Sequence, residues 1–312
     1  MPALPDPPPE LALTRDEPLA RHTYMRLGGP AAYFAEPDTI EELRRIAEWA
    51  RSVDLPLRVL GGGSNVLIAD EGIEAVVLSL RRACGDTTFE DTRVTVGAGV
   101  MLPALARAAA AHDLGGLEFA IGIPGTVGGA LQSNAGISDR REIGPLVDTV
   151  EVLRASEVVT LARTDLRFDY RTSSLRGSGD IVLEATLALE SRPREECEAE
   201  MKRLLEARQA SQPTAERNAG SIFRNPEGDV AGRLIEAAGC KGLSVGGAQI
   251  SELHANFIVH DGSATAADIA ALMLEVQRRV LDSAAVRLTS EVEWWGDGAP
   301  PPVFTGEPRG DA

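Results

Sequence analysis

The sequence predicts an α+β protein made of more than one domain. Its 312 residues exceed the usual size of one domain, and 44% of them are hydrophobic, which is enough to form buried cores. Segments with alternating apolar residues, typical of strands, are interspersed with segments of helical periodicity. Two glycine-rich stretches, at 60–67 and 116–136, interrupt this pattern and favour bare backbone pressed against a ligand.

The first part of the chain predicts a small α/β unit. Residues 38–53 predict a helix, with Asp38 as its cap and Glu41 at the capping-box position. Strands are expected on either side of the first glycine-rich stretch, at 55–60 and 75–80.

The middle of the chain predicts further strands and two helices. The expected strands are 93–97, 147–153 and 181–189, and the expected helices are 102–112 and 193–209. We expect no regular helix in 116–136, because its six glycines and Pro124 would interrupt one repeatedly. A domain boundary is expected near 211–216.

The last part repeats the α/β pattern. Helices are expected at 230–238 and 265–283, and strands at 256–259 and 287–295. Thr265 is the expected cap of the long helix, with Asp268 three residues later. In the last strand, Glu291 and Glu293 would share one face.

Composition excludes several classes of function. A net charge of −16 argues against nucleic-acid binding, which needs a basic face. An anionic substrate would need positive charge focused in a cleft. Three scattered cysteines and four histidines without ligand spacing predict neither a disulfide framework nor a metal site. No apolar run is long enough to span a membrane, and the proline-rich first residues lack the pattern of a signal peptide, so we expect a cytoplasmic protein.

The first glycine-rich stretch, LGGGSNVL, is a candidate pyrophosphate-binding loop. Its glycines Gly61, Gly62 and Gly63, with Ser64 and Asn65, could surround a pyrophosphate with backbone N–H groups. It lacks both the GK[ST] ending of a P-loop and the spacing of the Rossmann turn. The alternative is an ordinary tight turn between strands.

The second stretch contains IPGTVGG, where a Pro-Gly turn precedes Thr126. Gly125, Gly128 and Gly129 leave the backbone bare around that hydroxyl. Two separated glycine loops suggest one long ligand with a pyrophosphate and a flat ring, which fits FAD. The alternative is a segment whose glycines allow close packing.

Three further segments carry candidate reactive groups. Ser221 follows Gly220 but lacks a nucleophile elbow, so a proton donor or a simple turn serine is favoured over a nucleophile. Arg171, beside Tyr170, could bind a carboxylate with both nitrogens, or could be an ordinary surface arginine. Glu291 is either a site carboxylate or a residue on an exposed face. Lys241, one of only two lysines, lies in a glycine-rich segment.

Together these segments resemble the UDP-N-acetylenolpyruvoylglucosamine reductase (MurB) family. The matching motifs occur in order along nearly the whole chain: HTYMRLGGPA (22–31), LGGGSNVL (60–67), VGAG (96–99), GLEFAIGIPGTVGG (116–129), NAG (134–136), YRTSS (170–174), QP (212–213), AGSIFRNP (219–226), KGLSVGGAQIS (241–251), HANFIV (254–259) and SEVEWWG (290–296).

The resemblance implies a two-part FAD-binding unit of the vanillyl-alcohol-oxidase type followed by a C-terminal α/β substrate-binding domain. It also implies the shorter subtype, without an extra substrate-covering loop. The expected division is a disordered arm (1–18), FAD-binding subdomains (19–82 and 83–210), the substrate-binding domain (211–297) and a tail (298–312).

The resemblance further implies that NADPH reduces bound FAD, which then reduces UDP-N-acetylglucosamine enolpyruvate to UDP-N-acetylmuramate for peptidoglycan synthesis. Ser221 matches the family's proton donor to C2, and Arg171 and Glu291 match the residues at the enolate carboxylate. Tyr170, Asn225 and Lys241 match substrate-binding positions. The glycine loops match the FAD-binding positions.

Two other functions remain as alternatives. A flavin oxidase or dehydrogenase of the same fold could act on another sugar or hydroxy acid, although neither glycine loop offers a His or Cys for covalent flavin attachment. A nucleotide-binding regulator would bind FAD or a UDP-sugar without turnover, and the presence of Ser221 argues against it.

Overall fold

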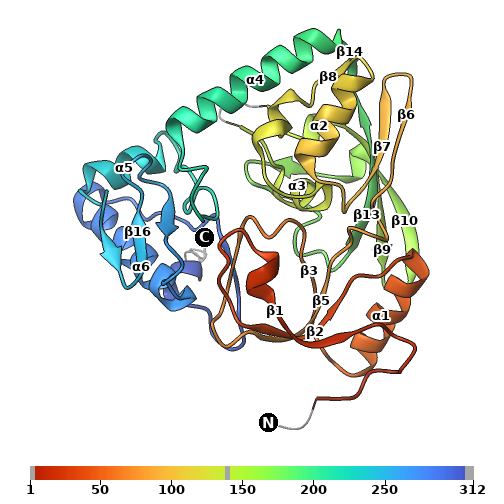
Figure 1. The fold of residues 1–312 in the computed structure, drawn as a ribbon, viewed down its shortest axis with the longest axis horizontal. Coiled ribbons are helices and arrows are strands. Elements are labelled where there is room, and N and C mark those ends of the chain that lie inside the picture. Colours follow the sequence, from red (N-terminus) through yellow and green to blue (C-terminus); the bar gives the residue numbers. More distant parts are fainter. Residues whose placement is uncertain (1–3, 138–140, 306–312) are drawn as a thin grey trace, which may run out of the picture. The chain divides into compact units, whose positions relative to one another are not determined.

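The computed structural model describes residues 4–137 and 141–305, which form two compact units (Figure 1). The chain passes between the units several times. Unit 1 comprises residues 1–15, 33–62 and 75–207, and unit 2 comprises residues 16–32, 63–74 and 208–312. The division after residue 207 lies a few residues before the boundary expected at 211–216. The division into two FAD-binding subdomains and a substrate-binding domain remains a prediction.

Unit 1 is built around an antiparallel five-stranded sheet of order β10-β9-β13-β7-β6. Its strands are β6 (Thr87–Glu90), β7 (Arg93–Gly97), β9 (Val147–Arg154), β10 (Glu157–Ala162) and β13 (Ile181–Ala188). Ala185 of the central strand β13 pairs with Val96 on one side and Val150 on the other. The expected strands at 93–97, 147–153 and 181–189 are confirmed, whereas β6 and β10 were not predicted.

The helices of unit 1 are α1 (Ile40–Ser52), α2 (Leu102–Ala111), α3 (Val127–Ser133) and α4 (Arg194–Ser211), whose last turn crosses into unit 2. The expected cap of α1 is wrong by one residue. Thr39 is the N-cap and accepts a hydrogen bond from the Glu42 N–H. Asp38 instead donates its N–H to the Glu42 carboxylate. Thr39 fits because a β-branched hydroxyl residue adopts the extended cap conformation readily.

Smaller sheets contain the remaining strands of unit 1, some of which extend into unit 2. A sheet of order β1-β2-β5-β3 contains β1 (Thr14–Pro18), β2 (Pro30–Ala35), β3 (Leu57–Val59) and β5 (Ile73–Leu78), and the unit boundaries fall within three of these strands. Two-stranded pairs are formed by β8 (Leu114–Gly115) with β14 (Glu190–Ser191) and by β11 (Phe168–Asp169) with β12 (Thr172–Ser173). Short 3-10 helices cover Glu118–Gly122, Gly144–Leu146 and Arg163–Asp165.

Unit 2 packs its core around the long helix α6 (Ala266–Ala284). The predicted capping box is confirmed, because Thr265 and Asp268 exchange side-chain-to-backbone hydrogen bonds. Asp70 adds two acceptors at the same helix end, to the N–H groups of Ala266 and Ala267. The unit also contains α5 (Ala231–Ala237), β15 (Ser244–Val245), β16 (Ala248–Ile250), β17 (Ile258–His260), the 3-10 helices Leu19–His22 and Pro302–Phe304, and the parallel pair β4 (Val66–Ile68) and β18 (Glu293–Trp295).

Three sequence expectations need correction. The strand expected at 287–295 is shorter, since β18 begins at Glu293 and Glu291 lies outside it. The arm expected to be disordered over 1–18 contains β1, and Leu11 is buried; residues 1–3 lie outside the description. Part of the tail is also ordered, because Val303 is buried in the core of unit 2. Apolar side chains at both ends provide the burial that orders these segments.

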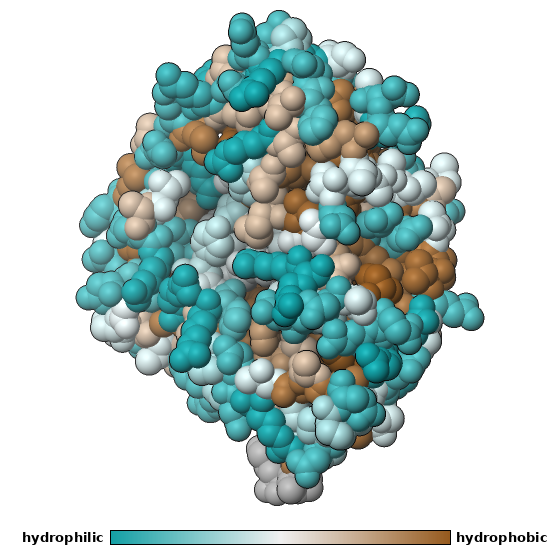
Figure 2. Space-filling model, turned by 45° about the vertical axis from the view of Figure 1, so that its right-hand side comes forward, coloured by the Kyte–Doolittle hydropathy of each residue, from teal (hydrophilic) through white to brown (hydrophobic). Residues whose placement is uncertain are grey.

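The view in Figure 2 shows a surface on which hydrophilic residues predominate and apolar residues form small groups between them. No helix in residues 4–137 and 141–305 is long and apolar enough to cross a membrane.

Candidate functional site

The two glycine loops meet within unit 1. A Cβ added to Gly61 would lie 2.6 Å from Oγ1 of Thr126, and one added to Gly62 would lie 2.6 Å from Cα of Gly125. Both separations are far below van der Waals contact, so only glycine allows the loops to approach this closely. The close-packing interpretation therefore holds at these positions, and it brings the two predicted ligand loops into direct contact.

The second loop leads into α3, contrary to the expectation that 116–136 contains no helix. Thr126, which is only 3% exposed, is the N-cap, and its hydroxyl accepts from the Gly129 N–H at 3.5 Å. The next two N–H groups, of Val127 and Gly128, donate to Val100 and Ala98. Tertiary contacts of α3 with β7 and β13 outweigh its low helix propensity. Gly129 remains exposed on the first turn.

The third glycine of the first loop belongs to unit 2 and makes a sharp turn. Gly63 has φ +65°, and a Cβ there would lie 2.1 Å from the His22 carbonyl oxygen. The Tyr24 N–H donates to the Gly63 carbonyl at 2.9 Å. The motif HTYMRLGGPA thus contacts the first glycine loop directly.

Asn65, Ser221 and Glu291 are linked within unit 2. The Asn65 amide donates to the Glu291 carbonyl at 2.9 Å, and the Glu293 N–H donates to the Asn65 carbonyl at 3.0 Å. The Glu291 N–H donates to the carbonyl of Ile222 at 2.9 Å. The first glycine loop, the Ser221 segment and the Glu291 segment therefore lie together. Asn65, expected to contact a cofactor, has a side chain that holds the Glu291 backbone.

Sequence reasoning gave no role to Asn256, which fixes the backbone after Ser221. Asn256 is 3% exposed, its side chain accepts from the Phe223 N–H at 3.0 Å, and it donates to the Phe223 carbonyl at 2.8 Å. Its own carbonyl accepts from the Ile222 N–H. Ser221 itself is half-buried, and its hydroxyl makes no hydrogen bond with any part of the chain that the structure describes. The serine hydroxyl is thus positioned by backbone and available as a donor.

Tyr170 and Arg171 form the two-residue turn between β11 and β12 in unit 1. Arg171 has φ +57°, a strained conformation for a residue with a side chain, and its guanidinium lies 5.2 Å from the Tyr170 ring centroid. Asn134, only 1% exposed, holds this hairpin by donating to the Asp169 carbonyl at 3.1 Å. The end of the second glycine loop therefore fixes the position of Arg171, a link that the motif NAG alone did not reveal.

The structure gives Asn225 and Lys241 clear local contacts. Asn225 Oδ1 accepts from the Ala231 N–H at 3.0 Å, at the start of α5. Lys241 Nζ pairs with Glu236 at 2.9 Å. His254 lies near both charges, and burial, the largest cause, lowers its pKa. Substrate contacts of Asn225 and Lys241 remain proposals.

Other reactive groups in the described residues offer no metal or thiol chemistry. No group of three metal-binding side chains occurs in residues 4–137 and 141–305. The three cysteines are buried and form no disulfide. Burial, assisted by Glu184, raises the pKa of Cys84 to about 12, so this thiol is not a nucleophile at neutral pH.

Gly129 leaves exposed backbone without a side chain on the first turn of α3, where a pyrophosphate of a flavin dinucleotide can approach closely. Residues 31–160, which contain both loops, match the FAD binding domain family. The protein is therefore an FAD-dependent oxidoreductase. Residues 212–295, which contain Ser221 and Glu291, match the family described as UDP-N-acetylenolpyruvoylglucosamine reductase, C-terminal domain.

Whole-chain relatives agree. The UDP-N-acetylenolpyruvoylglucosamine reductase of Synechococcus sp. (strain WH7803) is 45% identical over 297 residues, covering 92% of this chain and 94% of that protein. Reductase 2 of Symbiobacterium thermophilum is 43% identical and covers 91% and 92%. The crystal structure of the enzyme from Thermus caldophilus has a TM-score of 0.77 at 40% identity and covers 91% and 98%. The chain belongs to the UDP-N-acetylenolpyruvoylglucosamine reductase family.

Proposed function

We propose that this protein reduces UDP-N-acetylglucosamine enolpyruvate to UDP-N-acetylmuramate, with NADPH as the electron source, in the cytoplasmic synthesis of peptidoglycan precursors. The main support is that a hydrogen bond from the Glu291 N–H to the Ile222 carbonyl joins the segments that carry Ser221 and Glu291, in a chain that matches named reductases over nearly its full length. Bound FAD would accept a hydride from NADPH and supply a hydride to C3 of the enolpyruvyl group.

In this proposal the protein stabilises charge and delivers a proton. Hydride addition at C3 places negative charge on C2 and the adjacent carboxylate. Arg171 is assigned to that carboxylate because a guanidinium remains charged and can donate two parallel hydrogen bonds. Glu291 is assigned to the same carboxylate of the enolpyruvyl group. The Ser221 hydroxyl then donates its proton to C2, which completes saturation of the double bond.

The remaining assignments concern binding. Tyr170, Asn225 and Lys241 are proposed to contact the UDP-sugar. Lys241 is 2.9 Å from Glu236, so its charge is already held in place before the substrate arrives.

The visible absorbance spectrum tests the proposal. A yellow protein should lose its colour when NADPH is added without oxygen, and should regain it only when the enolpyruvyl UDP-sugar follows. A protein that bleaches but ignores this sugar would indicate a flavin enzyme of another specificity. One that binds the sugar without any colour change would indicate a regulator.

A further inference from the structure

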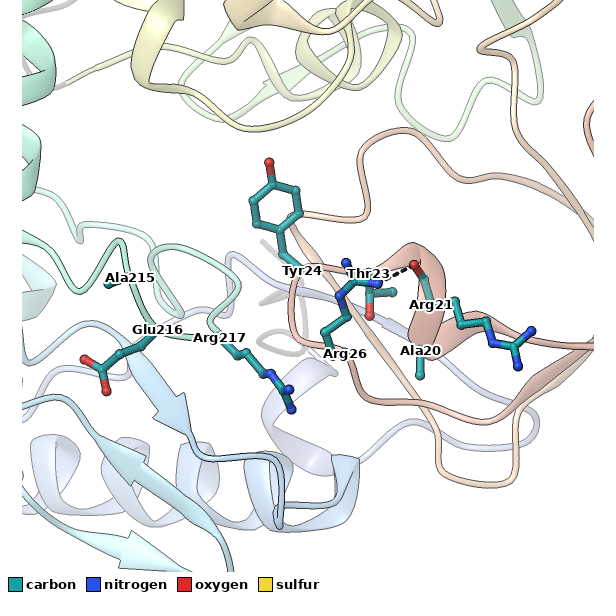
Figure 3. A pocket seen from close by; sticks show the side chains of 8 residues that line it. All are labelled: Ala20, Arg21, Thr23, Tyr24, Arg26, Ala215, Glu216 and Arg217. Carbon is teal, nitrogen blue, oxygen red and sulfur yellow. Dashed lines mark hydrogen bonds between the residues drawn. The ribbon is translucent and has the colours of Figure 1, made fainter.

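A pocket of about 580 Å³ lies within unit 2, separate from the contacts of Ser221 and Glu291 described above (Figure 3). It is formed by two segments, one within residues 20–26 and one at 215–217, shortly before Ser221. The lining residues are Ala20, Arg21, Thr23, Tyr24, Arg26, Ala215, Glu216 and Arg217. Its volume is in the range that suits a small-molecule ligand.

The pocket concentrates positive charge in a chain whose net charge is −16. Arg21, Arg26 and Arg217 contribute three guanidinium groups, and none forms an ion pair with another residue in 4–137 or 141–305. The carboxylate of Glu216 points away from Arg217, so it does not neutralise that side chain (Figure 3). Such a local reversal of charge is what an acidic protein needs to attract an anion.

The backbone around these arginines is arranged to hold them. Arg26 has φ +55°, an unusual conformation for a residue with a side chain, and its Nη1 donates to the Arg21 carbonyl at 2.7 Å. A Cβ at Gly262 would lie 2.6 Å from Nη1 of Arg217, so this glycine leaves the space that the guanidinium occupies.

An aromatic ring and a fourth arginine accompany the cluster. Tyr24 is 46% exposed, so part of its ring is accessible to a base. Arg208 lies close enough for its charge to interact with Tyr24, and burial lowers the pKa of Arg208. Guanidinium groups bind phosphate, and an accessible aromatic ring can pack against the nucleoside that carries it.

We infer that this pocket binds a phosphate group of a nucleotide substrate through Arg26 and Arg217, with Tyr24 against the nucleoside. The inference rests on the proposed function, which supplies two nucleotides: NADPH with its 2′-phosphate and a UDP-sugar with its diphosphate. Both present the same phosphate chemistry to a guanidinium.

Isothermal titration of the FAD-loaded protein with 2′,5′-ADP and, separately, with UDP tests this inference. The variants are Arg217→Ala and Arg26→Ala, both at exposed positions. Arg287→Ala is the matched control, because it removes an exposed arginine of the same unit outside the pocket. Each pocket variant should weaken binding of one probe by about tenfold or more, as expected for loss of a charge-assisted hydrogen bond, while the control should not.

The two probes distinguish the sources of the phosphate. Weaker 2′,5′-ADP binding alone would assign the pocket to NADPH, and weaker UDP binding alone would assign it to the UDP-sugar. Equal affinities in all variants would overturn the inference, and so would loss of FAD from the pocket variants without a change in either probe. Because these titrations need no turnover, a protein that binds the probes as expected but fails to reduce the enolpyruvyl sugar would contradict the proposed function alone.

Discussion

The position of Ser221 is set by the backbone that follows it, since Ile222 and Phe223 hydrogen bond to Asn256. Ser221→Ala should therefore preserve the fold and remove only the hydroxyl that we propose as the proton donor. We expect flavin reduction by NADPH to remain fast and the second half-reaction to be lost, as measured by stopped-flow absorbance.

Ser244→Ala is a suitable control, because it removes an exposed hydroxyl from β15 in the same unit. The assignment of Ser221 would be wrong if Ser221→Ala slowed flavin reduction but still released product at the normal rate.

Arg171 combines a strained backbone with a guanidinium placed beside Tyr170. Arg171→Lys keeps the charge but loses the two parallel donors. We expect a loss of about 2–4 kcal/mol of transition-state stabilisation, by comparison with other oxyanion donors. Steady-state kcat/KM for the enolpyruvyl sugar measures this loss. Arg167→Lys, at a nearby exposed position, is the control. If the turnover of Arg171→Lys is close to that of this control, the role assigned to Arg171 is refuted.

At the scale of elements, the segment carrying Ser221 is not part of a regular strand. The backbone of this segment is held by the side chain of Asn256, which hydrogen bonds to both the N–H and the carbonyl of Phe223. Asn256→Ala should lower the free energy of unfolding by about 2–4 kcal/mol, because two buried backbone groups lose their partner.

Urea denaturation of the holoprotein measures this effect. Gln249→Ala, which removes one exposed side-chain hydrogen bond to Gly242, should change stability by much less. Equal stabilities of the two variants would show that Asn256 does not hold the segment.

At the scale of the whole molecule, partly exposed ion pairs make stability depend on pH. Hydrogen bonding from Arg203, and then from Arg141, lowers the pKa of Glu200 from 4.5 to about 2. A carboxyl whose folded-state pKa is lowered stabilises the fold above its unfolded pKa, and this stabilisation disappears as the pH falls toward the folded pKa. We therefore expect the free energy of unfolding to decrease between about pH 5 and pH 2.

Glu200→Gln should reduce this pH dependence in thermal melts recorded over that range. Glu184 provides a contrast, because burial, together with Glu151 and Asp86, raises its pKa. Its stabilising contribution is present at low pH and is lost as the pH rises. Glu184→Gln should therefore not reduce the decrease in stability at acidic pH. If the stability of Glu200→Gln and of the parent protein decreased equally at acidic pH, the contribution of Glu200 would be disproved.

The sequence by itself determined the local features of this protein. The capping box at Thr265 and Asp268, the strand at 93–97 and the two glycine loops were all readable, because each depends on neighbouring residues. The ordered series of motifs also identified the family, which the whole-chain relatives confirmed. Local patterns did not determine element ends, as the cap of α1 and the shortened β18 show.

Only the tertiary structure decided which of these local features meet. Asn65 reaches the Glu291 carbonyl across 226 residues, Gly61 lies against Thr126, and Asn256 holds the Ser221 segment. Each such contact forms only after a long loop of chain has closed, and its energy comes from packing and burial that no local pattern specifies. The helix α3 illustrates the same point: its glycines disfavour a helix locally, yet its contacts with β7 and β13 stabilise one.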